Sequence, residues 1–318
     1  MKLLISLPAY NEEKTIAFVI KSIPVNINGI DEINILVFDD GSTDKTRELA
    51  ESSGATAIGN SENKGLSRVF QEIVEKALEQ NVDVLVNIDA DGQFNGRDVP
   101  KLLEPILKNR ADCVTASRFI NKELIPQMPK FKKWGNEKVA RLISFVARKR
   151  LYDVSCGFRA YSKEALLNLN LFSKFTYTHE SLLNLIFKGL RIVEVPVRVK
   201  GEREFGNSKV AHNLWRYGYN IFNTIFRTML DYKPLKFFGW SGIILFIIGF
   251  LLDLFVLIRL LAIGEITPYK SVGFGGLALN IFGLLLFIIG LIADMINRVR
   301  MTQERILYYE KKGLFKNK

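Results

Sequence analysis

Cysteine and histidine are scarce in this chain. Its 318 residues include two cysteines, Cys113 and Cys156, and two histidines, His179 and His212. Two separated thiols do not make the disulfide framework of a small secreted domain, and two scattered histidines do not indicate a metal site. We therefore expect the cysteines to be free, buried thiols in a reducing compartment.

Two common nucleotide-binding motifs are also absent. No G-x-G-x-x-G follows an expected strand, and G-x-x-x-x-G-K-[ST] does not occur. These motifs bring main-chain N–H groups to phosphates, so their absence counts against dinucleotide and P-loop binding. The net charge of +11 suits an anionic lipid surface or a phosphorylated substrate. No nucleic-acid recognition motif accompanies this charge, so we expect no nucleic-acid partner.

Long hydrophobic runs are not lacking. Residues 237–261 and 272–293 are almost entirely apolar. A helix of about 20 apolar residues crosses the hydrocarbon core of a membrane. A pair of buried core helices is the alternative, but neither run shows an amphipathic stripe. We predict a transmembrane hairpin at 236–297, with spans at about 237–261 and 272–296.

Basic residues flank the hairpin on its two outer sides. They are Arg227, Lys233, Lys236, Arg298, Arg300, Arg305, Lys311 and Lys312, whereas the connection 262–271 holds Lys270 alone. The positive-inside rule places the connection outside and both flanks in the cytoplasm. The N-terminal apolar run is too short for a signal peptide. We expect a two-span cell-membrane protein whose catalytic domain and both termini are cytoplasmic.

The first half of the chain alternates short apolar runs with helical stretches. The expected strands are 3–8, 33–40, 56–59, 82–89 and 111–118, with a later one at 190–199. This alternation indicates an α/β fold with a mostly parallel sheet. Ligands of such sheets bind beyond the carboxyl ends of the strands. Four polar segments fall at those ends: PAYNEE, DDGSTD, NSENKG and DADGQ.

The remaining segments complete the expected organisation. Residues 121–133 are basic and contain prolines, which favours a mobile surface loop, and 134–150 form a basic helix candidate. Residues 208–231 carry aromatic residues at helical spacing beside arginines, as an interfacial or docking helix does. We therefore expect a catalytic domain at 1–206, amphipathic interfacial helices at 207–235, the hairpin, and a basic cytosolic tail at 298–318.

Asp89 and Asp91 end the strand expected at 82–89. Alternate residues of an extended chain point to the same side, and adjacent carboxylates repel unless a proton or cation lies between them. Mg²⁺ or Mn²⁺ accepts such oxygen ligands and leaves positions open for phosphate oxygens, and Gln93 supplies a third oxygen. A solvated turn is the alternative for a lone D-x-D. The position after a buried strand favours the metal site.

Other polar residues of these segments suit a nucleotide. Ser42 or Thr43 can cap the next helix, whereas Asp40 can accept hydrogen bonds from a ribose or a base. Glu12 can do the same. Lys64, beside a glycine, can neutralise phosphate.

Cations for two phosphates and two further carboxylates lie downstream. The cations are Arg118, Lys132, Lys133, Arg203 and Lys209. Asp153 could orient the acceptor or the sugar. Glu180 is equally compatible with that role and with a structural one.

As an ordered set, the segments resemble glycosyltransferase family 2 over about residues 3–210. They are P-A-Y-N-E-E, D-D-G-S-T-D, N-K-G, D-A-D-G-Q, D-V-S-C-G-F-R-A-Y and R-x-x-G-N-S-K. The resemblance is strongest to the dolichol-phosphate mannose synthase and polyprenyl-phosphate glycosyltransferase branch. It implies a GT-A (Rossmann-like) fold, an NDP-sugar donor with uridine or guanosine, and Mg²⁺ or Mn²⁺ at Asp89 and Asp91. It also implies inverting transfer to a polyprenyl phosphate, undecaprenyl or dolichyl.

The resemblance further implies roles for single residues. Members contact the nucleoside with positions that match Pro8, Tyr10, Asn11, Glu12 and Asp40, and Gln93 joins the metal. Positions that match Arg118, Arg203, Ser208 and Lys209 approach the phosphates of donor or lipid. Two spans resemble the bacterial glucosyltransferase type.

The chemistry agrees with this branch. A lipid phosphate is already anionic, so the enzyme needs charge neutralisation and in-line positioning more than a strong base. A polysaccharide synthase or a glycolipid glycosyltransferase would use a hydroxyl acceptor and need a base, and the Q-x-x-R-W segment of such synthases is absent. A non-catalytic membrane scaffold is the other alternative. Within the hairpin, we expect Asp253 to meet Asn280 or a neighbouring protomer, giving a homo-oligomer.

Overall fold

The computed structural model describes residues 1–172, 177–201 and 214–315. Within its helices, the side chains of 130–132, 214–218, 220 and 221 are not described. The chain forms two compact units. One comprises Met1–Ile225 together with Leu307–Lys318, and the other comprises Phe226–Ile306.

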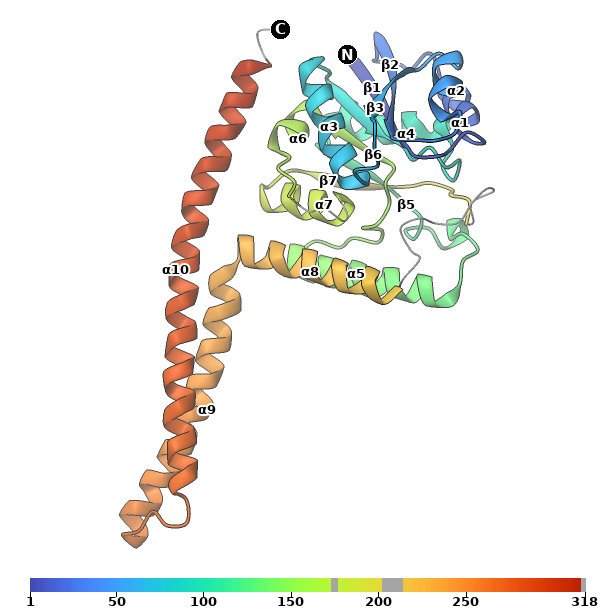
Figure 1. Cartoon of the computed structure of the whole chain (residues 1–318). Coiled ribbons are helices and arrows are strands. Elements are labelled where there is room, and N and C mark those ends of the chain that lie inside the picture. Colours follow the sequence, from blue (N-terminus) through green and yellow to red (C-terminus); the bar gives the residue numbers. More distant parts are fainter. Residues whose placement is uncertain (173–176, 202–213, 316–318) are drawn as a thin grey trace. The chain divides into compact units, whose positions relative to one another are not determined.

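The first unit is built on a seven-stranded sheet with the order β3-β2-β1-β4-β6-β5-β7 (Figure 1). Its strands are β1 Lys2–Ala9, β2 Glu32–Asp40, β3 Thr56–Asn60, β4 Val84–Asn87, β5 Cys113–Ser117, β6 Arg159–Ser162 and β7 Ile192–Pro196. Every pairing is parallel except those of β6, which runs antiparallel to both β4 and β5. The predicted mostly parallel α/β sheet is therefore confirmed.

Helices connect these strands. They are α1 Ile16–Ser22, α2 Thr46–Ser52, α3 Leu66–Glu79, α4 Val99–Leu107, α5 Lys130–Ala147, α6 Lys163–Asn168 and α7 Tyr177–Phe187, with short 3₁₀ turns η1 Gly96–Asp98 and η2 Lys122–Leu124. Helix α3 illustrates why they form. Its residues Val69, Phe70, Ile73, Val74 and Ala77 recur at spacings of three and four and are buried together.

The sheet register brings the candidate site residues to one edge. Ala9 of β1 lies opposite Asp39 of β2, and Asn87 at the end of β4 lies opposite Ser6. Because β6 is antiparallel, its first residue, Arg159, also pairs with Asn87. The start of β6 thus lies at the edge where the parallel strands end.

Several sequence-based expectations need correction. Strand β4 ends at Asn87, so Asp89 and Asp91 lie in the following turn and not on an extended strand. Helix α5 begins at Lys130, inside the segment expected to be a loop. Strand β6 and helices α6 and α7 were not expected. The basic tail is helical, because the last helix continues to Leu314.

The second unit holds the helix α9 Pro234–Ile263, the part of α10 Lys270–Leu314 up to Ile306, and the end of α8 Leu214–Tyr232 from Phe226 on. By length and composition, α9 and α10 could cross a membrane. Glycines allow their backbones to approach. A Cβ atom on Gly242 would lie 2.6 Å from the carbonyl oxygen of Gly283.

The hairpin also contains the polar contact expected from the sequence. Asn280 donates a hydrogen bond from Nδ2 to Oδ2 of Asp253 at 2.7 Å. The contact joins α9 to α10 within one chain. Oligomerisation through these residues stays a prediction.

Candidate functional site

The loops that follow β1 and β2 are joined by hydrogen bonds. Asn11 adopts a left-handed conformation (φ 54°), and its Oδ1 accepts a hydrogen bond from the main-chain N–H of Thr43 at 2.8 Å. The N–H of Asn11 donates to Oγ of Ser42 at 2.9 Å, and that of Glu12 donates to Oγ1 of Thr46 at 2.8 Å. The PAYNEE and DDGSTD segments therefore form one structural unit.

Two further predicted nucleoside contacts lie on the same strand and loop. Pro8 is a buried residue of β1, and Tyr10 follows the strand, partly exposed. Both lie at the carboxyl end of β1, next to the joined loops.

Asp40 fixes the start of helix α3. Its Oδ1 accepts the N–H of Lys64 and its Oδ2 accepts the N–H of Gly65, both at 2.9 Å. Gly65 needs its φ of 89°, which other residues rarely adopt. The Lys64 side chain is half-exposed and lies 3.7 Å from Glu72. Asp40 thus has a structural role that the sequence pattern did not predict, and its contact with a nucleoside stays a prediction.

The turn after β4 carries the D-x-D carboxylates. Asp91 is 5% exposed, and its Oδ1 accepts the N–H of Gln93 at 3.0 Å. Gln93 in turn pairs with Lys200, since its Nε2 donates to the Lys200 carbonyl oxygen at 3.1 Å and its own carbonyl accepts the Lys200 N–H at 3.0 Å. These bonds tie the turn to the segment that follows β7.

The Asp89 carboxylate lies directly against Gly157, two residues before β6. A Cβ atom on Gly157 would lie 2.8 Å from both Oδ1 and Oδ2 of Asp89. The bare glycine therefore leaves room for the carboxylate.

Asp89, Asp91 and Gln93 fit a divalent cation in their chemistry, because carboxylate and amide oxygens are the ligands that Mg²⁺ and Mn²⁺ prefer. Among the described residues, no group of three or more His, Cys, Asp or Glu side chains could hold a metal ion. A cation here would need oxygens from Gln93 and from a substrate as well.

A buried hydrogen-bond network underlies Gly157. Nδ2 of Asn87 donates to the hydroxyl of Tyr177 at 2.9 Å and to the Gly157 carbonyl oxygen at 3.2 Å. Its Oδ1 accepts a hydrogen bond from Ser6 Oγ at 2.9 Å. Burial, with the nearby charge of Asp89, raises the pKa of Tyr177 well above its ordinary value. Tyr177 is therefore a neutral hydroxyl at physiological pH.

Arg118 and Asp153 form a bidentate ion pair after β5. Arg118 Nε lies 2.6 Å from Oδ2 and Nη2 lies 2.8 Å from Oδ1, and Nη2 also donates to Ser155 Oγ at 2.7 Å. The side chain of Asp153 has no exposed surface, whereas that of Arg118 is 18% exposed. Burial alone would raise the pKa of Asp153, but the charge and hydrogen bonds of Arg118 outweigh it and lower that pKa.

Glu194 of β7 holds the main chain on which Asp153 lies. Its carboxylate accepts the main-chain N–H groups of Tyr152, at 2.9 Å, and of Asp153, at 2.8 Å. Burial raises the pKa of Glu194. The segment that carries Asp153 is thus fixed to the sheet.

Arg159 is fully buried, which sequence reasoning missed. Its guanidinium donates to Thr178 O, Ser181 Oγ, Val154 O and Thr115 Oγ1 at 2.6–3.3 Å. These acceptors are all neutral, although buried charges are usually paired. Through these hydrogen bonds, the Arg159 side chain links β5, α7 and the segment before β6.

Helix α7 contributes two residues whose roles the sequence left open or unassigned. Glu180 accepts the main-chain N–H of Phe172 at 2.8 Å, which favours the structural alternative. Burial lowers the pKa of His179 to about 3, so this imidazole is neutral at physiological pH.

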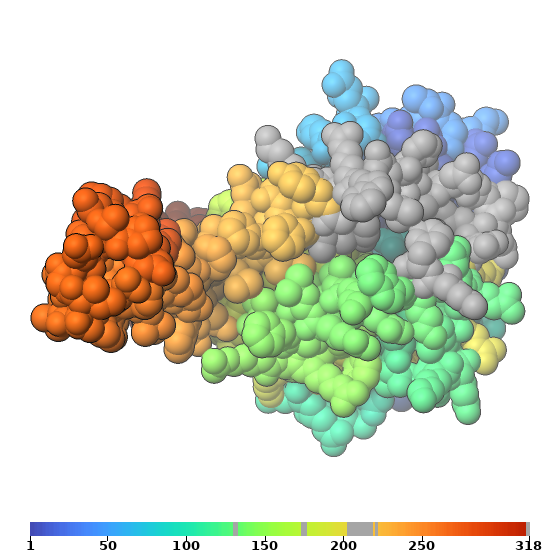
Figure 2. All heavy atoms as spheres, turned by 90° about the horizontal axis from the view of Figure 1, so that it is seen from below, coloured from blue at the N-terminus to red at the C-terminus, as the bar shows by residue number. Residues whose placement is uncertain are grey.

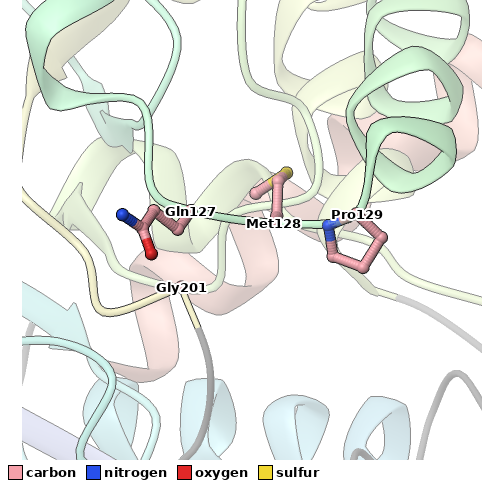
Figure 3. A pocket seen from close by; sticks show the side chains of 4 residues that line it. All are labelled: Gln127, Met128, Pro129 and Gly201. Atoms are coloured by element: carbon pink, nitrogen blue, oxygen red, sulfur yellow. The ribbon is translucent and has the colours of Figure 1, made fainter.

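The other predicted phosphate contacts belong to helix α5 and to the chain segment after Gly201. Arg203, Ser208 and Lys209 lie outside the described residues, as does the side chain of Lys132. Lys133 is partly buried in α5. A cavity of about 470 Å³ lies before this helix, lined by Gln127, Met128, Pro129 and Gly201 (Figure 3). Gly201 directly follows Lys200, the residue that is hydrogen-bonded to Gln93.

Helix α5 presents aromatic and basic side chains to solvent. Trp134 is 63% exposed and Phe145 81% exposed, and the Lys138 ammonium lies 5.6 Å from the centroid of the Trp134 ring. Figure 2 shows the green surface of this helix on the face seen from below. Such a surface combines the two features of an interfacial helix.

Comparison with known proteins gives consistent matches. The family model described as "Glycosyl transferase family 2" matches residues 5–169. Glycosyltransferase AglJ of Haloferax volcanii is 28% identical over 298 residues, which cover 93% of this chain and 94% of that protein. The UDP-N-acetylglucosamine–dolichyl-phosphate N-acetylglucosaminyltransferase of Methanococcus voltae is 32% identical over 60% of this chain and 83% of its own length.

Solved structures share the fold. Glucosyl-3-phosphoglycerate synthase of Mycobacterium tuberculosis, solved with Mn²⁺, UDP and glucosyl-3-phosphoglycerate, superposes with a TM-score of 0.56 and 24% identity. The match covers 71% of this chain and 79% of that one. This likeness establishes the GT-A architecture expected from the sequence.

Proposed function

The chain belongs to glycosyl transferase family 2, and from this premise we propose that it transfers a sugar from an NDP-sugar to a polyprenyl phosphate, with inversion at the anomeric carbon. The observation that carries the proposal is a juxtaposition at one sheet edge. The carboxylates of Asp89 and Asp91 follow β4, and the arginine of the Arg118–Asp153 pair follows the nearby strand β5. An arginine at this edge suits an acceptor that carries a phosphate.

The donor would bind across the ends of β1, β2 and β4. The joined loops that contain Asn11, Glu12 and Asp40 would hold the nucleoside, with Pro8 and Tyr10 at its base, and Lys64 would face phosphate. Asp89, Asp91 and Gln93 would hold Mg²⁺ or Mn²⁺, which when bound neutralises the charge of the departing diphosphate.

The acceptor phosphate would meet Arg118. Asp153 is buried beneath the guanidinium, so we assign it a positioning role and leave contact with the acceptor to Arg118. A guanidinium is planar and always charged, and its fork of N–H groups matches the geometry of phosphate oxygens. A polyprenyl phosphate is ionised at neutral pH, so its oxygen can attack the anomeric carbon without a strong base. Lys132, Lys133, Arg203, Ser208 and Lys209 remain proposed phosphate contacts.

The lipid acceptor has two sources of support. The Methanococcus voltae relative is named for transfer to dolichyl phosphate. Helices α9 and α10 are long and apolar enough to hold the chain in the membrane in which such a lipid resides. We propose a cell-membrane protein with cytoplasmic catalytic domain and termini.

A donor panel tests the proposal. The detergent-solubilised full chain is incubated with UDP- and GDP-hexoses and N-acetylhexosamines, with undecaprenyl or dolichyl phosphate, and with or without Mn²⁺. We expect lipid-phosphate-dependent and Mn²⁺-dependent release of nucleoside diphosphate, with one sugar on each lipid. Polymer would indicate a polysaccharide synthase, and turnover only with a hydroxyl acceptor would indicate a glycolipid transferase. No turnover with any donor would favour a scaffold.

A further inference from the structure

Gly157 makes an unusually close approach to a candidate metal ligand. A Cβ atom at this position would lie 2.8 Å from both carboxylate oxygens of Asp89, and real Cβ atoms essentially never come so near. Gly157 is not among the glycines with positive φ, so an alanine could adopt its backbone conformation. The contact with Asp89 is therefore the steric reason for a glycine here.

Buried side chains fix Gly157 on its other side. Asn87 is completely buried and donates to the Gly157 carbonyl oxygen at 3.2 Å, and the Tyr177 hydroxyl lies 3.4 Å from the same oxygen. Asn87 is held in turn by Ser6, and the Tyr177 ring stacks on Phe70 with the centroids 4.0 Å apart. A network whose members all have partners is rigid, because no member can rotate without losing a hydrogen bond.

We propose that Gly157 is a positioning residue for Asp89, held in place by the side chains of Asn87 and Tyr177. The inference rests on the proposed function, since it takes the Asp89 carboxylate to meet the cation at the donor diphosphate. Substitution of a residue that orients a metal ligand without itself binding the metal typically weakens metal affinity by about 10- to 100-fold. The three residues come from β4, α7 and the segment before β6, so the assignment depends on the fold and not on any local motif.

The variant Gly157→Ala separates positioning from folding. The added methyl group meets the end of an Asp side chain, which can rotate away, so we expect a melting temperature close to that of the wild type. The same rotation displaces the carboxylate. We expect Mn²⁺ binding to weaken by about 10- to 100-fold, measured by electron paramagnetic resonance on the solubilised full chain with UDP and, in parallel, with GDP. The kcat should fall while KM for the lipid phosphate stays unchanged.

Two variants calibrate this measurement. Asp89→Asn removes the charge of the carboxylate, and its loss of Mn²⁺ affinity is the reference for the loss in Gly157→Ala. Gly135→Ala is the matched control, because a Cβ on Gly135 of α5 would meet nothing within 4 Å. It should bind Mn²⁺ as the wild type does.

A pair of tyrosine variants tests the network without adding volume. Tyr177 and Tyr161 are both fully buried, and their rings lie 4.0 Å and 5.6 Å from that of Phe70. Among the described residues, the buried Tyr161 hydroxyl has no hydrogen-bond partner, so its removal breaks no bond to Gly157. Tyr177→Phe removes the hydrogen bond from Asn87 and the one to Gly157. It should weaken Mn²⁺ binding by about 5-fold or more, since one hydrogen bond corresponds to about that factor. Tyr161→Phe should leave the binding unchanged.

The outcomes are distinguishable. Wild-type Mn²⁺ binding by Gly157→Ala, or equal effects of the two tyrosine substitutions, would overturn the inference alone. If the wild-type protein binds no Mn²⁺ in the presence of either UDP or GDP, the metal part of the proposed function is overturned, and this inference with it. Should Gly157→Ala fail to fold, the tyrosine pair decides.

Discussion

Arg118 and Asp153 depend on each other at the scale of single residues. The Asp153 carboxylate is completely buried, and its ionised form is favoured by the arginine above it. Wild-type Asp153 therefore stabilises the fold above its unfolded pKa, and this contribution is lost as the pH falls through its lowered native value. Without the guanidinium, burial would be the largest remaining influence on this pKa and would raise it, against the main-chain hydrogen bonds of Arg118 and Ser155.

The variant Arg118→Met tests this dependence. We expect it to lose about 3 kcal/mol of stability at pH 8, because a buried charge is left without its partner. The deficit should shrink toward pH 5, where a carboxyl with a raised pKa takes up a proton. Thermal unfolding at the two pH values measures both effects, and Arg118→Met/Asp153→Asn should recover stability at pH 8. A deficit independent of pH would contradict this account.

Asp91 offers a second test at this scale. Its Oδ1 accepts the N–H of Gln93, and an asparagine can keep that bond while it loses the charge. We therefore expect Asp91→Asn to fold normally but to lose about 100-fold or more in Mn²⁺-dependent transfer, as when an electrostatic contact to the reacting group is removed. Asp98→Asn, in the next turn, is the control. Near-normal activity of Asp91→Asn would refute the metal assignment.

At the scale of helices and strands, the hairpin depends on close backbone contact. A Cβ on Gly283 would lie 2.7 Å from the Gly242 carbonyl oxygen, whereas one on Gly275 would meet nothing within 4 Å. We expect Gly283→Leu to destabilise the hairpin by about 1–3 kcal/mol through overpacking. Gly275→Leu, on the same helix, should have little effect. Thermal unfolding in detergent compares them, and equal melting temperatures would disprove the packing argument.

Most strands of the first half could be predicted, because each is an apolar run that ends in polar residues. Strand β6 could not. It has four residues, RAYS, and begins with Arg159, which looks like a surface cation in the sequence. The neutral groups that accept hydrogen bonds from Arg159 come from β5, α7 and the segment before β6, and only the folded chain brings them together.

The candidate site was predictable to a similar extent. The ordered polar segments placed Asp89, Asp91 and Asp40 at one sheet edge, since parallel strands end on the same side. Asp89 follows β4 and Gly157 precedes β6, so the two residues meet at one end of this antiparallel strand pair. They are far apart in the sequence, and no local pattern encodes their contact. Arg118 and Asp153 are also far apart in the sequence, so each could be predicted as a site residue but their ion pair could not.

At the scale of the whole molecule, the proposed membrane orientation can be tested by cysteine labelling. Burial raises the pKa of the Cys113 and Cys156 thiols to about 12, so neither should react with a maleimide. We expect a membrane-impermeant maleimide to label Glu265→Cys, between α9 and α10, in intact cells. Asn28→Cys, on an exposed loop of the catalytic domain, should be labelled only after lysis. The reverse pattern would invert the topology.

The reversed strand β6 also determines when the site can be completed during synthesis. Gly157 is made 68 residues after Asp89, and at about 5–20 residues per second the ribosome needs roughly 3–14 s to reach it. Throughout that interval β4 has no neighbour on one side, and its free N–H and C=O groups could pair with another nascent chain. Polysomes that bring several copies together would therefore be most prone to aggregation before residue 162 has emerged.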